Sequence, residues 1–281
     1  MNPDKLPVVL VLSGNDPTGG AGLQADIETL VSLGCHPAPV VTALTVQDTV
    51  GVKHYAPVEA NMVIAQARAV LEDMPVAAIK AGMLGSAENV TALAGILHDY
   101  PEIPLILDPV FASGRGDPLS DDALIEAMSA LLIPNTALIT PNIMELMRLA
   151  PDADNVDAAA QELLSMGCAF VLVTGTHDKT PEVINRLYGN RRLLETFKWE
   201  RLPYSYHGSG CTLAAACAAT FAHDMDVIEA VAEAQDFTWH ALERGARLGM
   251  GQLLPDRLYW ARDQEDFDKD DDEDEGEEPI H

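Results

Sequence analysis

The sequence predicts an α/β protein in which helices cover both faces of a mostly parallel sheet. Six short apolar runs lie along the chain, and they lack the polar alternation of a half-exposed sheet, which is typical of parallel strands. Helical patterns separate several of these runs, and this alternation indicates βαβ units. The predicted strands are residues 8–12, 39–41, 76–79, 105–107, 137–139 and 170–173.

The helices are predicted from apolar residues at helical spacing. One helix is expected over residues 23–33, and two more over residues 210–222 and 227–244. The apolar faces of two further helices are Val63, Ala67, Val70, Leu71 and Met74 in the first, and Leu124, Ala127, Met128 and Leu131 in the second. We expect Ser120 to cap the second of these helices and Pro134 to stop it.

The C-terminal part of the chain predicts an edge hairpin and a tail. Residues 182–188 and 192–198 flank Gly189-Asn190, a turn sequence that favours two antiparallel strands at the edge of the sheet. From residue 263 onward the chain is a run of acids with almost no apolar residues. We therefore expect one domain over residues 1–262 and a disordered acidic tail over 263–281.

The composition narrows the classes of partner. With 17 Lys and Arg against 44 Asp and Glu, the formal net charge is −27, and such a surface would repel nucleic acid. No apolar run approaches the roughly 20 residues that span a bilayer. The apolar stretch at residues 7–12 is too short for a signal peptide, so we expect a cytoplasmic protein with no membrane partner. The four cysteines include no Cys-x-x-Cys pair, which argues against a disulfide framework.

Polar and glycine residues follow each of the six predicted strands. In an open α/β sheet the ligand crevice lies beyond the carboxyl ends of the strands. Ordinary turn chemistry explains any single case but less easily all six. The sequence therefore predicts a site at this edge, built from residues 13–22, 42–47, 80–83, 108–109, 140–145 and 174–175.

Residues 207–216 (HGSGCTLAAA) are the most informative segment. Two glycines lead into a helix of small residues, whose first backbone N–H groups have no intrahelical partner and can bind an anion such as a transferring phosphoryl group. Cys211 stands in the first turn, where the same N–H groups and the helix dipole would favour its thiolate. The alternative, a small packing residue, stays open for Cys211 and is the expectation for Cys217.

Two weaker signals come from glycines and from carboxylates. Residues 14–22 are rich in glycine, yet they match neither a Walker A loop nor Gly-x-Gly-x-x-Gly, so they predict only a close backbone approach before a helix. Asp108 and Glu145 stand at two strand ends and together suit a nucleotide-bound Mg²⁺. Taken singly, Asp108 is better explained as a turn residue before Pro109, and Glu145 as an exposed helical acid.

Taken together, seven segments resemble the hydroxymethylpyrimidine/phosphomethylpyrimidine kinase family of the ribokinase-like superfamily. The resemblance runs in register from about residue 7 to residue 261, and it implies a three-layer αβα sandwich with a mostly parallel central sheet and an antiparallel edge hairpin. The segments are residues 13–26 (SGNDPTGGAGLQAD), 42–47 with Gly51-Val52, 80–86 (KAGMLGS), 107–110, 116–119 (GDPL), 139–142 with Glu145, and 207–213 (HGSGCTL).

The resemblance implies an enzyme of thiamine biosynthesis that uses ATP and Mg²⁺. Members phosphorylate the hydroxymethyl oxygen of 4-amino-5-hydroxymethyl-2-methylpyrimidine and then add a second phosphate to the monophosphate. The implied partners are this small pyrimidine and ATP, and superfamily habit suggests a homodimer. Two alternatives stay open: a pyridoxal kinase of the same superfamily, and a non-catalytic pyrimidine-binding regulator with an eroded nucleotide site.

By position, the resemblance also implies roles for the residues of the pyrimidine and phosphoryl sites. Gln47 would hydrogen-bond the aminopyrimidine, because a neutral amide donates and accepts at once. The residues expected to line its pocket are Gly14, Asp26 and Met83. Cys211 occupies the position where most sugar kinases of the superfamily carry an aspartate base. The anion hole is expected to consist of Gly208, Ser209 and Gly210.

The nucleotide and metal residues follow in the same way. Asn142 and Glu145 match the Asn-x-x-Glu motif of the superfamily for metal and phosphate, and Asp108 is expected near the metal or the substrate. The residues expected to border the nucleotide are Thr174, Gly175 and His207. Many members carry a Lys where this chain has Thr174, which removes a cation near ATP. Arg115 is a loop residue that could supply the charge instead.

Overall fold

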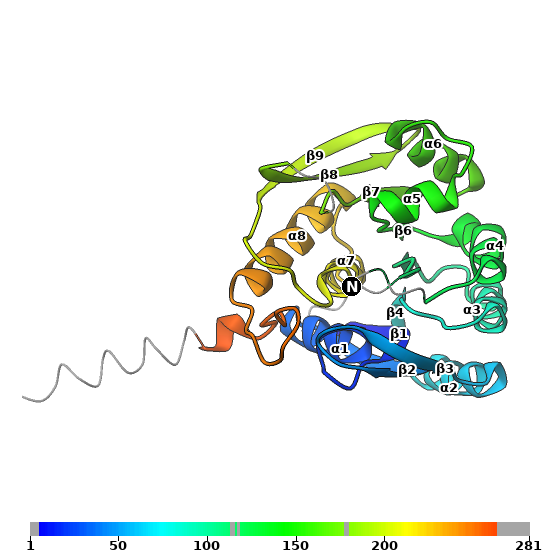
Figure 1. Cartoon of the computed structure of the whole chain (residues 1–281). Helices are drawn as coiled ribbons and strands as arrows, with labels where there is room; N and C mark the ends of the chain where they lie inside the picture. The colour runs from blue at the N-terminus through cyan, green and yellow to red at the C-terminus, as the bar shows by residue number, and fades with distance from the viewer. Residues whose placement is uncertain (1–5, 113–115, 117–118, 177–179, 263–281) are drawn as a thin grey trace, which may run out of the picture.

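A nine-stranded sheet runs through the computed structural model, which describes residues 6–112, 116, 119–176 and 180–262. The strand order is β3-β2-β1-β4-β5-β6-β7-β8-β9 (Figure 1). Neighbours from β2 to β7 are parallel, whereas β3, β8 and β9 pair antiparallel at the two edges. The strands are β1 (Val8–Asn15), β2 (His36–Gln47), β3 (Val52–Pro57), β4 (Val76–Ala81), β5 (Leu105–Leu107), β6 (Leu138–Ile139), β7 (Phe170–Val173), β8 (Glu182–Gly189) and β9 (Arg192–Glu200). The predicted parallel sheet and its edge hairpin are confirmed.

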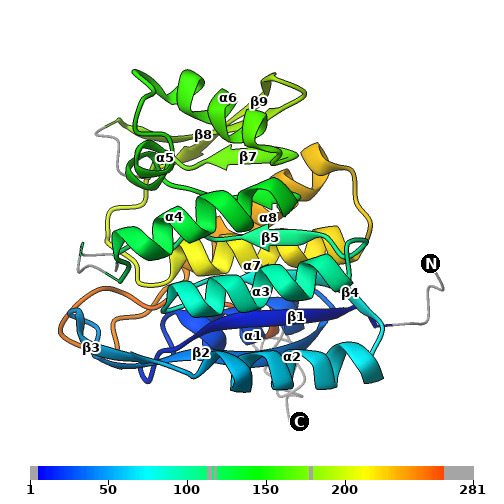
Figure 2. The same ribbon diagram turned by 90° about the vertical axis from the view of Figure 1, so that its right-hand side faces the viewer.

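Helices cover both faces of the sheet, so the three-layer αβα arrangement is also confirmed (Figures 1 and 2). Five helices pack on one face: α2 (Ala60–Asp73), α3 (Ala87–Asp99), α4 (Asp122–Leu131), α5 (Ile143–Leu149) and α6 (Val156–Met166). Three pack on the other: α1 (Gly22–Ser32), α7 (Ser209–Ala222) and α8 (Val227–Glu243). Among the described residues, no helix is both long enough and apolar enough to cross a membrane.

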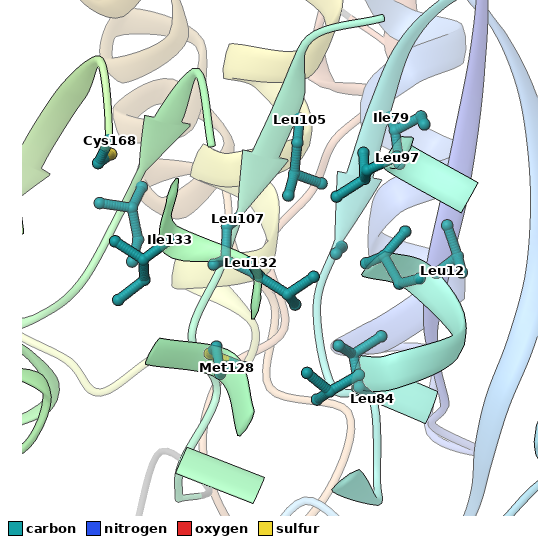
Figure 3. Packing of buried hydrophobic residues seen from close by; sticks show 14 of the residues in the cluster. Leu12, Ile79, Leu84, Leu97, Leu105, Leu107, Met128, Leu132, Ile133 and Cys168 are labelled. Carbon is teal, nitrogen blue, oxygen red and sulfur yellow. The ribbon is translucent and has the colours of Figure 1, made fainter. Parts of the chain in front are cut away.

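Each parallel strand contributes side chains to two cores. In β1, Leu10 and Leu12 pack toward α2–α6, while Val9 and Val11 pack toward α1, α7 and α8, because successive side chains of a strand point to opposite faces. Figure 3 shows the first core, where leucines of β5 lie in one cluster with Met128 of α4. Burial of both faces explains why these strands read as continuous apolar runs.

One local expectation needs correction. Ser120 does not cap α4. Instead the Asp121 carboxylate accepts the Leu124 N–H at 2.9 Å, and the Ser120 hydroxyl donates to the Phe111 carbonyl at 3.1 Å. An aspartate one residue nearer the helix is an equally good cap, and the sequence allowed both. The helix α4 ends at Leu131, just before Pro134, as expected, and Pro134 lies in a short 3-10 helix (Ile133–Asn135) that follows it. The acidic tail lies outside the described residues.

Candidate active site

A cavity of about 700 Å³ opens at the carboxyl edge of the parallel strands, where the sequence predicts a site. Its walls include the ends of successive strands and the first turn of α7. The residues at or just after the ends of β1, β4, β5, β6 and β7 that line it are Gly14, Met83, Asp108, Thr140 and Thr174. One cavity therefore collects residues that lie far apart in the sequence.

Of the fourteen residues to which the resemblance assigns a place in the pyrimidine, phosphoryl, nucleotide or metal site, all but two line this cavity. The lining residues among them are Gly14, Gln47, Met83, Asp108, Asn142, Glu145, Thr174, His207, Gly208, Ser209, Gly210 and Cys211. The structure thus brings the implied pyrimidine residues, the glycine turn and the carboxylates into one space.

The two exceptions are Asp26 and Gly175. The Asp26 side chain is fully buried behind the cavity, where its carboxylate lies 2.9 Å from Lys80 Nζ. Gly175 donates its N–H to Asn185 Oδ1 at 2.9 Å, and a Cβ at this position would collide with the Ile184 carbonyl oxygen. Asp26 faces a buried cation because an unpaired buried charge is costly, and Gly175 permits the close approach of β8.

The first turn of α7 is built around Gly208. This residue is the N-cap and has φ 78°, a left-handed conformation that favours glycine. A Cβ here would collide with the Gly20 carbonyl oxygen. Gly208 offers no side chain to cap the helix, so the first N–H groups of α7 remain available to an anion.

Residues 14–22, which we call the glycine loop, fold around the carboxylate of Asp16. This carboxylate accepts the Thr18 N–H at 2.8 Å and the Ala21 N–H at 2.9 Å, and it lies 2.8 Å from His207 Nε2. Burial raises the pKa of Asp16, but hydrogen bonds from His207, Gln47 and Thr18 outweigh it and hold the pKa well below its usual range. Asp16 thus joins the implied pyrimidine residue Gln47 to the turn before α7, a role that local sequence did not reveal.

Lys80 is buried beneath the cavity between two carboxylates. Its Nζ lies 2.9 Å from Asp26 Oδ1 and 3.9 Å from Asp108 Oδ2. Burial lowers the pKa of Lys80, but Asp26 and Asp108 outweigh it, so the side chain stays charged. The sequence predicted Lys80 only as the first residue after a strand, whereas it lies within β4. In the sequence, the one signal of the buried pair Lys80–Asp26 was a lysine at the end of an apolar strand.

Cys211 is a neutral thiol, and the expectation that the helix end favours its thiolate is wrong. Burial and the neighbouring Asp108 raise the pKa of Cys211 to about 12, despite the opposing charge of Lys80 and a hydrogen bond from the Gly22 N–H. The thiol donates to Asp108 instead. Burial also raises the pKa of Asp108, with Lys80 opposing the rise and Asp26 adding to it.

Asn142 and Glu145 bond each other at the start of α5. The Glu145 N–H donates to Asn142 Oδ1 at 3.0 Å, and the Asn142 N–H donates to Glu145 Oε2 at 2.9 Å. This reciprocal cap gives the Asn-x-x-Glu spacing a structural reason beside its implied ligand role. Burial, with Asp108 adding to it, raises the pKa of Glu145 to about 8.

The carboxylates of Asp108 and Glu145 fit Mg²⁺, although no group of three or more His, Cys, Asp or Glu side chains in the described chain could enclose a metal. Mg²⁺ is usually held through one or two carboxylates together with waters and substrate phosphates. Both side chains line the cavity, and Asp108 Oδ2 has no hydrogen-bond partner. The two carboxylates are therefore suited to an ion that is held mainly by a nucleotide.

Two arginines, Arg148 and Arg201, line the cavity. The Arg201 guanidinium donates to the carbonyl oxygens of Thr176 and Thr180, both at 2.7 Å. The Arg148 guanidinium lies over the ring of Phe111, 5.2 Å from its centre. Sequence reasoning named neither arginine, and Arg115, which it did name, lies outside the described residues.

Comparison with known proteins identifies the family. A family model described as phosphomethylpyrimidine kinase matches residues 16–256. A hydroxymethylpyrimidine/phosphomethylpyrimidine kinase of Mycobacterium bovis is 38% identical over 251 residues, which are 87% of this chain and 91% of that protein. The phosphomethylpyrimidine kinase structure from Clostridium difficile 630 has a TM-score of 0.72 at 32% identity and covers 83% of this chain and 98% of its own.

A second kinase is also similar in structure. The pyridoxal kinase of Staphylococcus aureus, solved in complex with pyridoxal, has a TM-score of 0.83 at 26% identity and covers 92% of this chain and 96% of its own. Its sequence is less similar to this chain than those of the pyrimidine kinases above. On the matched family model and on sequence identity over most of its length, the chain belongs to the phosphomethylpyrimidine kinase family.

Proposed function

We propose that this protein is an ATP-dependent hydroxymethylpyrimidine and phosphomethylpyrimidine kinase. It transfers the terminal phosphoryl of ATP to the hydroxymethyl oxygen of 4-amino-5-hydroxymethyl-2-methylpyrimidine, and then a second phosphoryl to the monophosphate, for thiamine synthesis. The observation that carries the proposal is that Gln47 and the Gly208–Cys211 turn line one cavity. Acceptor and phosphoryl donor can therefore meet without leaving the site.

The pyrimidine end is organised by the amide of Gln47. Its NH₂ group donates to the Asp16 carboxylate, which fixes the orientation of the amide and leaves its oxygen to accept from an exocyclic amine. Gly14 and Met83 form an apolar wall nearby, since a Cβ at residue 14 would lie 3.1 Å from Met83 Sδ. A flat heteroaromatic ring fits between such a wall and an amide.

The phosphoryl end is organised by backbone N–H groups. The free N–H groups of the α7 turn face developing negative charge without any rearrangement, and phosphoryl transfer depends chiefly on such positioning and charge stabilisation. Asp108 and Glu145 would hold Mg²⁺, which neutralises charge on the phosphates of ATP.

The first step requires that the alcohol lose a proton. As the alcohol oxygen bonds to phosphorus and the bond to the ADP oxygen breaks, the hydroxyl proton passes to Cys211 Sγ while the thiol proton passes to the Asp108 carboxylate. This relay suits a thiol that is neutral and already donates to Asp108. The second acceptor is a phosphate, which carries no hydroxyl proton that must be removed.

Mass spectrometry of the products tests the proposal directly. With ATP, Mg²⁺ and the hydroxymethylpyrimidine, we expect the monophosphate first and the diphosphate later, with ADP released only when the pyrimidine is present. Absence of both products would rule the proposal out. Because pyridoxal kinases share the fold, turnover of pyridoxal under the same conditions tests the second candidate. A higher kcat/KM on pyridoxal would reverse the assignment.

A further inference from the structure

Arg257 has a buried guanidinium that joins three parts of the framework around the site. Its side chain is 1% exposed. Nε donates to Thr212 Oγ1 at 2.9 Å, in the first turn of α7. One terminal nitrogen donates to the Gly20 carbonyl at 2.5 Å, and the other to Glu28 Oε2 at 3.0 Å and the Gly19 carbonyl at 3.5 Å. The glycine loop, α1 and α7 therefore share a single side chain.

These bonds end on the backbone that forms the phosphoryl site. The Thr212 hydroxyl, which accepts from Arg257, donates to the Gly208 carbonyl at 2.9 Å. Gly208 in turn packs directly on the Gly20 carbonyl that accepts from Arg257. The guanidinium thus reaches both sides of the contact between the glycine loop and the α7 turn. Arg257 does not line the cavity, so it acts through these neighbours.

We propose that Arg257 is a positioning residue that holds the glycine loop and the first turn of α7 in register, so that the free N–H groups of the α7 turn face the transferring phosphoryl. The inference rests on the proposed function, because it assigns the α7 turn to that group. A planar guanidinium carries five donors in a fixed fork, which suits acceptors on three separate elements. Lysine offers one nitrogen and cannot satisfy all of them.

The test compares Arg257→Lys with the unchanged protein in both phosphorylation steps. Because misplacement by about 1 Å can lower a rate about 100-fold, we expect kcat to fall about 10- to 100-fold in each step. We expect KM for the pyrimidine to change less than about threefold, because Arg257 bonds neither Asp16 nor Gln47. Binding of ADP with aluminium fluoride and Mg²⁺, which mimics the transferring phosphoryl, should weaken by a factor similar to the fall in kcat.

Two control variants separate positioning from stability. Glu28→Gln removes the ion pair on the same guanidinium but leaves the bonds to Thr212 and Gly20, so kcat should not change. Leu163→Ala opens a cavity in the core on the opposite face of the sheet, so it should lower the melting temperature and leave kcat unchanged well below that temperature.

A variant on the other side of the bond keeps the inference testable even if Arg257→Lys does not fold. Thr212→Val removes the link from α7 and should lower kcat by itself. In the double variant Arg257→Lys with Thr212→Val, the two losses of kcat should not add, since both substitutions break the same connection. The inference is overturned if Arg257→Lys or Thr212→Val keeps its kcat, or if the losses in the double variant add fully. Failure of the unchanged protein to phosphorylate the pyrimidine would instead contradict the proposed function.

Discussion

Lys80 and Asp108 face each other beneath the cavity, with 3.9 Å between Nζ and Oδ2, while Asp26 takes the closer ammonium contacts. Two carboxylates therefore share one buried cation. The carboxylate of Asp108 is the one that lies farther from the ammonium group, and it is also the one that lines the cavity. Lys80 thus stabilises the fold by pairing with Asp26, and it places a positive charge near the site by facing Asp108.

Replacing Lys80 by Met should destabilise the protein by about 3–5 kcal/mol, because it leaves Asp26 buried without its partner. The double variant Lys80→Met with Asp26→Asn should recover much of that loss. Urea unfolding measures both. Lys53→Met is the matched control, since Lys53 pairs with Asp48 at the surface and should contribute within about 0.5 kcal/mol. Equal losses for the two lysines would contradict this account.

Cys211→Ala should impair the first phosphorylation more than the second. The alcohol must pass on a proton, and a positioned acceptor for that proton contributes about 10²–10⁴-fold, whereas the phosphate acceptor has no such proton. Single-turnover assays of each step measure the difference. Cys217→Ala, buried deeper in the same helix, should leave the ratio of the two rates unchanged. Losses of equal size in both steps for Cys211→Ala would exclude the relay.

Gly208→Ala should abolish detectable transfer while the protein remains folded. The substitution forces an alanine into φ 78° and drives its Cβ toward the Gly20 carbonyl, which must displace the α7 turn. Product formation and circular dichroism check the two halves of this prediction. Gly95→Ala in α3 is the control, because nothing beyond the adjoining backbone of its own helix lies within 4 Å of its Cβ position. That variant should be fully active and about 0.5–1 kcal/mol more stable.

The pKa of Glu145 predicts a dependence of stability on pH. Burial and Asp108 raise this pKa from 4.5 to about 8, so the folded state keeps a proton that the unfolded state has lost between these values. Stability therefore falls as pH rises from 4.5 to about 8. Melting curves in EDTA should show that the melting temperature of Glu145→Gln rises relative to that of the unchanged protein as pH increases across this range. A constant difference between the two would show that Glu145 does not titrate there.

Arg148→Met should weaken ATP binding. The Arg148 guanidinium lies at the cavity beside Phe111, and Thr174 supplies no cation to the phosphates. Since a charge-assisted hydrogen bond contributes about 1.5–3 kcal/mol, the dissociation constant of ATP should rise roughly 10-fold or more. Calorimetry measures it, with Arg68→Met as control, because Arg68 pairs with Asp99 at the surface. An unchanged affinity would place the phosphates elsewhere.

The sequence predicted the features that depend on local pattern. Continuous apolar runs marked the buried parallel strands, and Gly189-Asn190 marked the hairpin. Strand β3 was missed because it lies at the edge with all of its residues half or fully exposed, so it carries no such run. Its pairing with β2 comes from tertiary contacts rather than from its own residues.

The parts of the site that lie at strand ends and glycine turns were predictable from the sequence. The pairs of charged residues that are distant in the sequence were not. Asp26 and Lys80 are 54 residues apart and Arg257 and Glu28 are 229 apart, so no window of sequence pairs them. The prediction that the Cys211 thiolate is favoured was wrong for the same reason. Its helix end was visible in the sequence, but burial and the charge of Asp108 decide its pKa.

The carboxylate of Asp16 receives Gln47 on one side and His207 on the other, which has a consequence for how specificity can change. Any substitution that turns the Gln47 amide toward a different ring also shifts the Asp16 carboxylate, and with it the His207 imidazole. Under the proposed function, with Gln47 at the acceptor and His207 beside the nucleotide, selectivity for the acceptor and affinity for the nucleotide are therefore coupled through Asp16. A substitution that changes the pyrimidine end of the cavity therefore requires a compensating substitution at the nucleotide end.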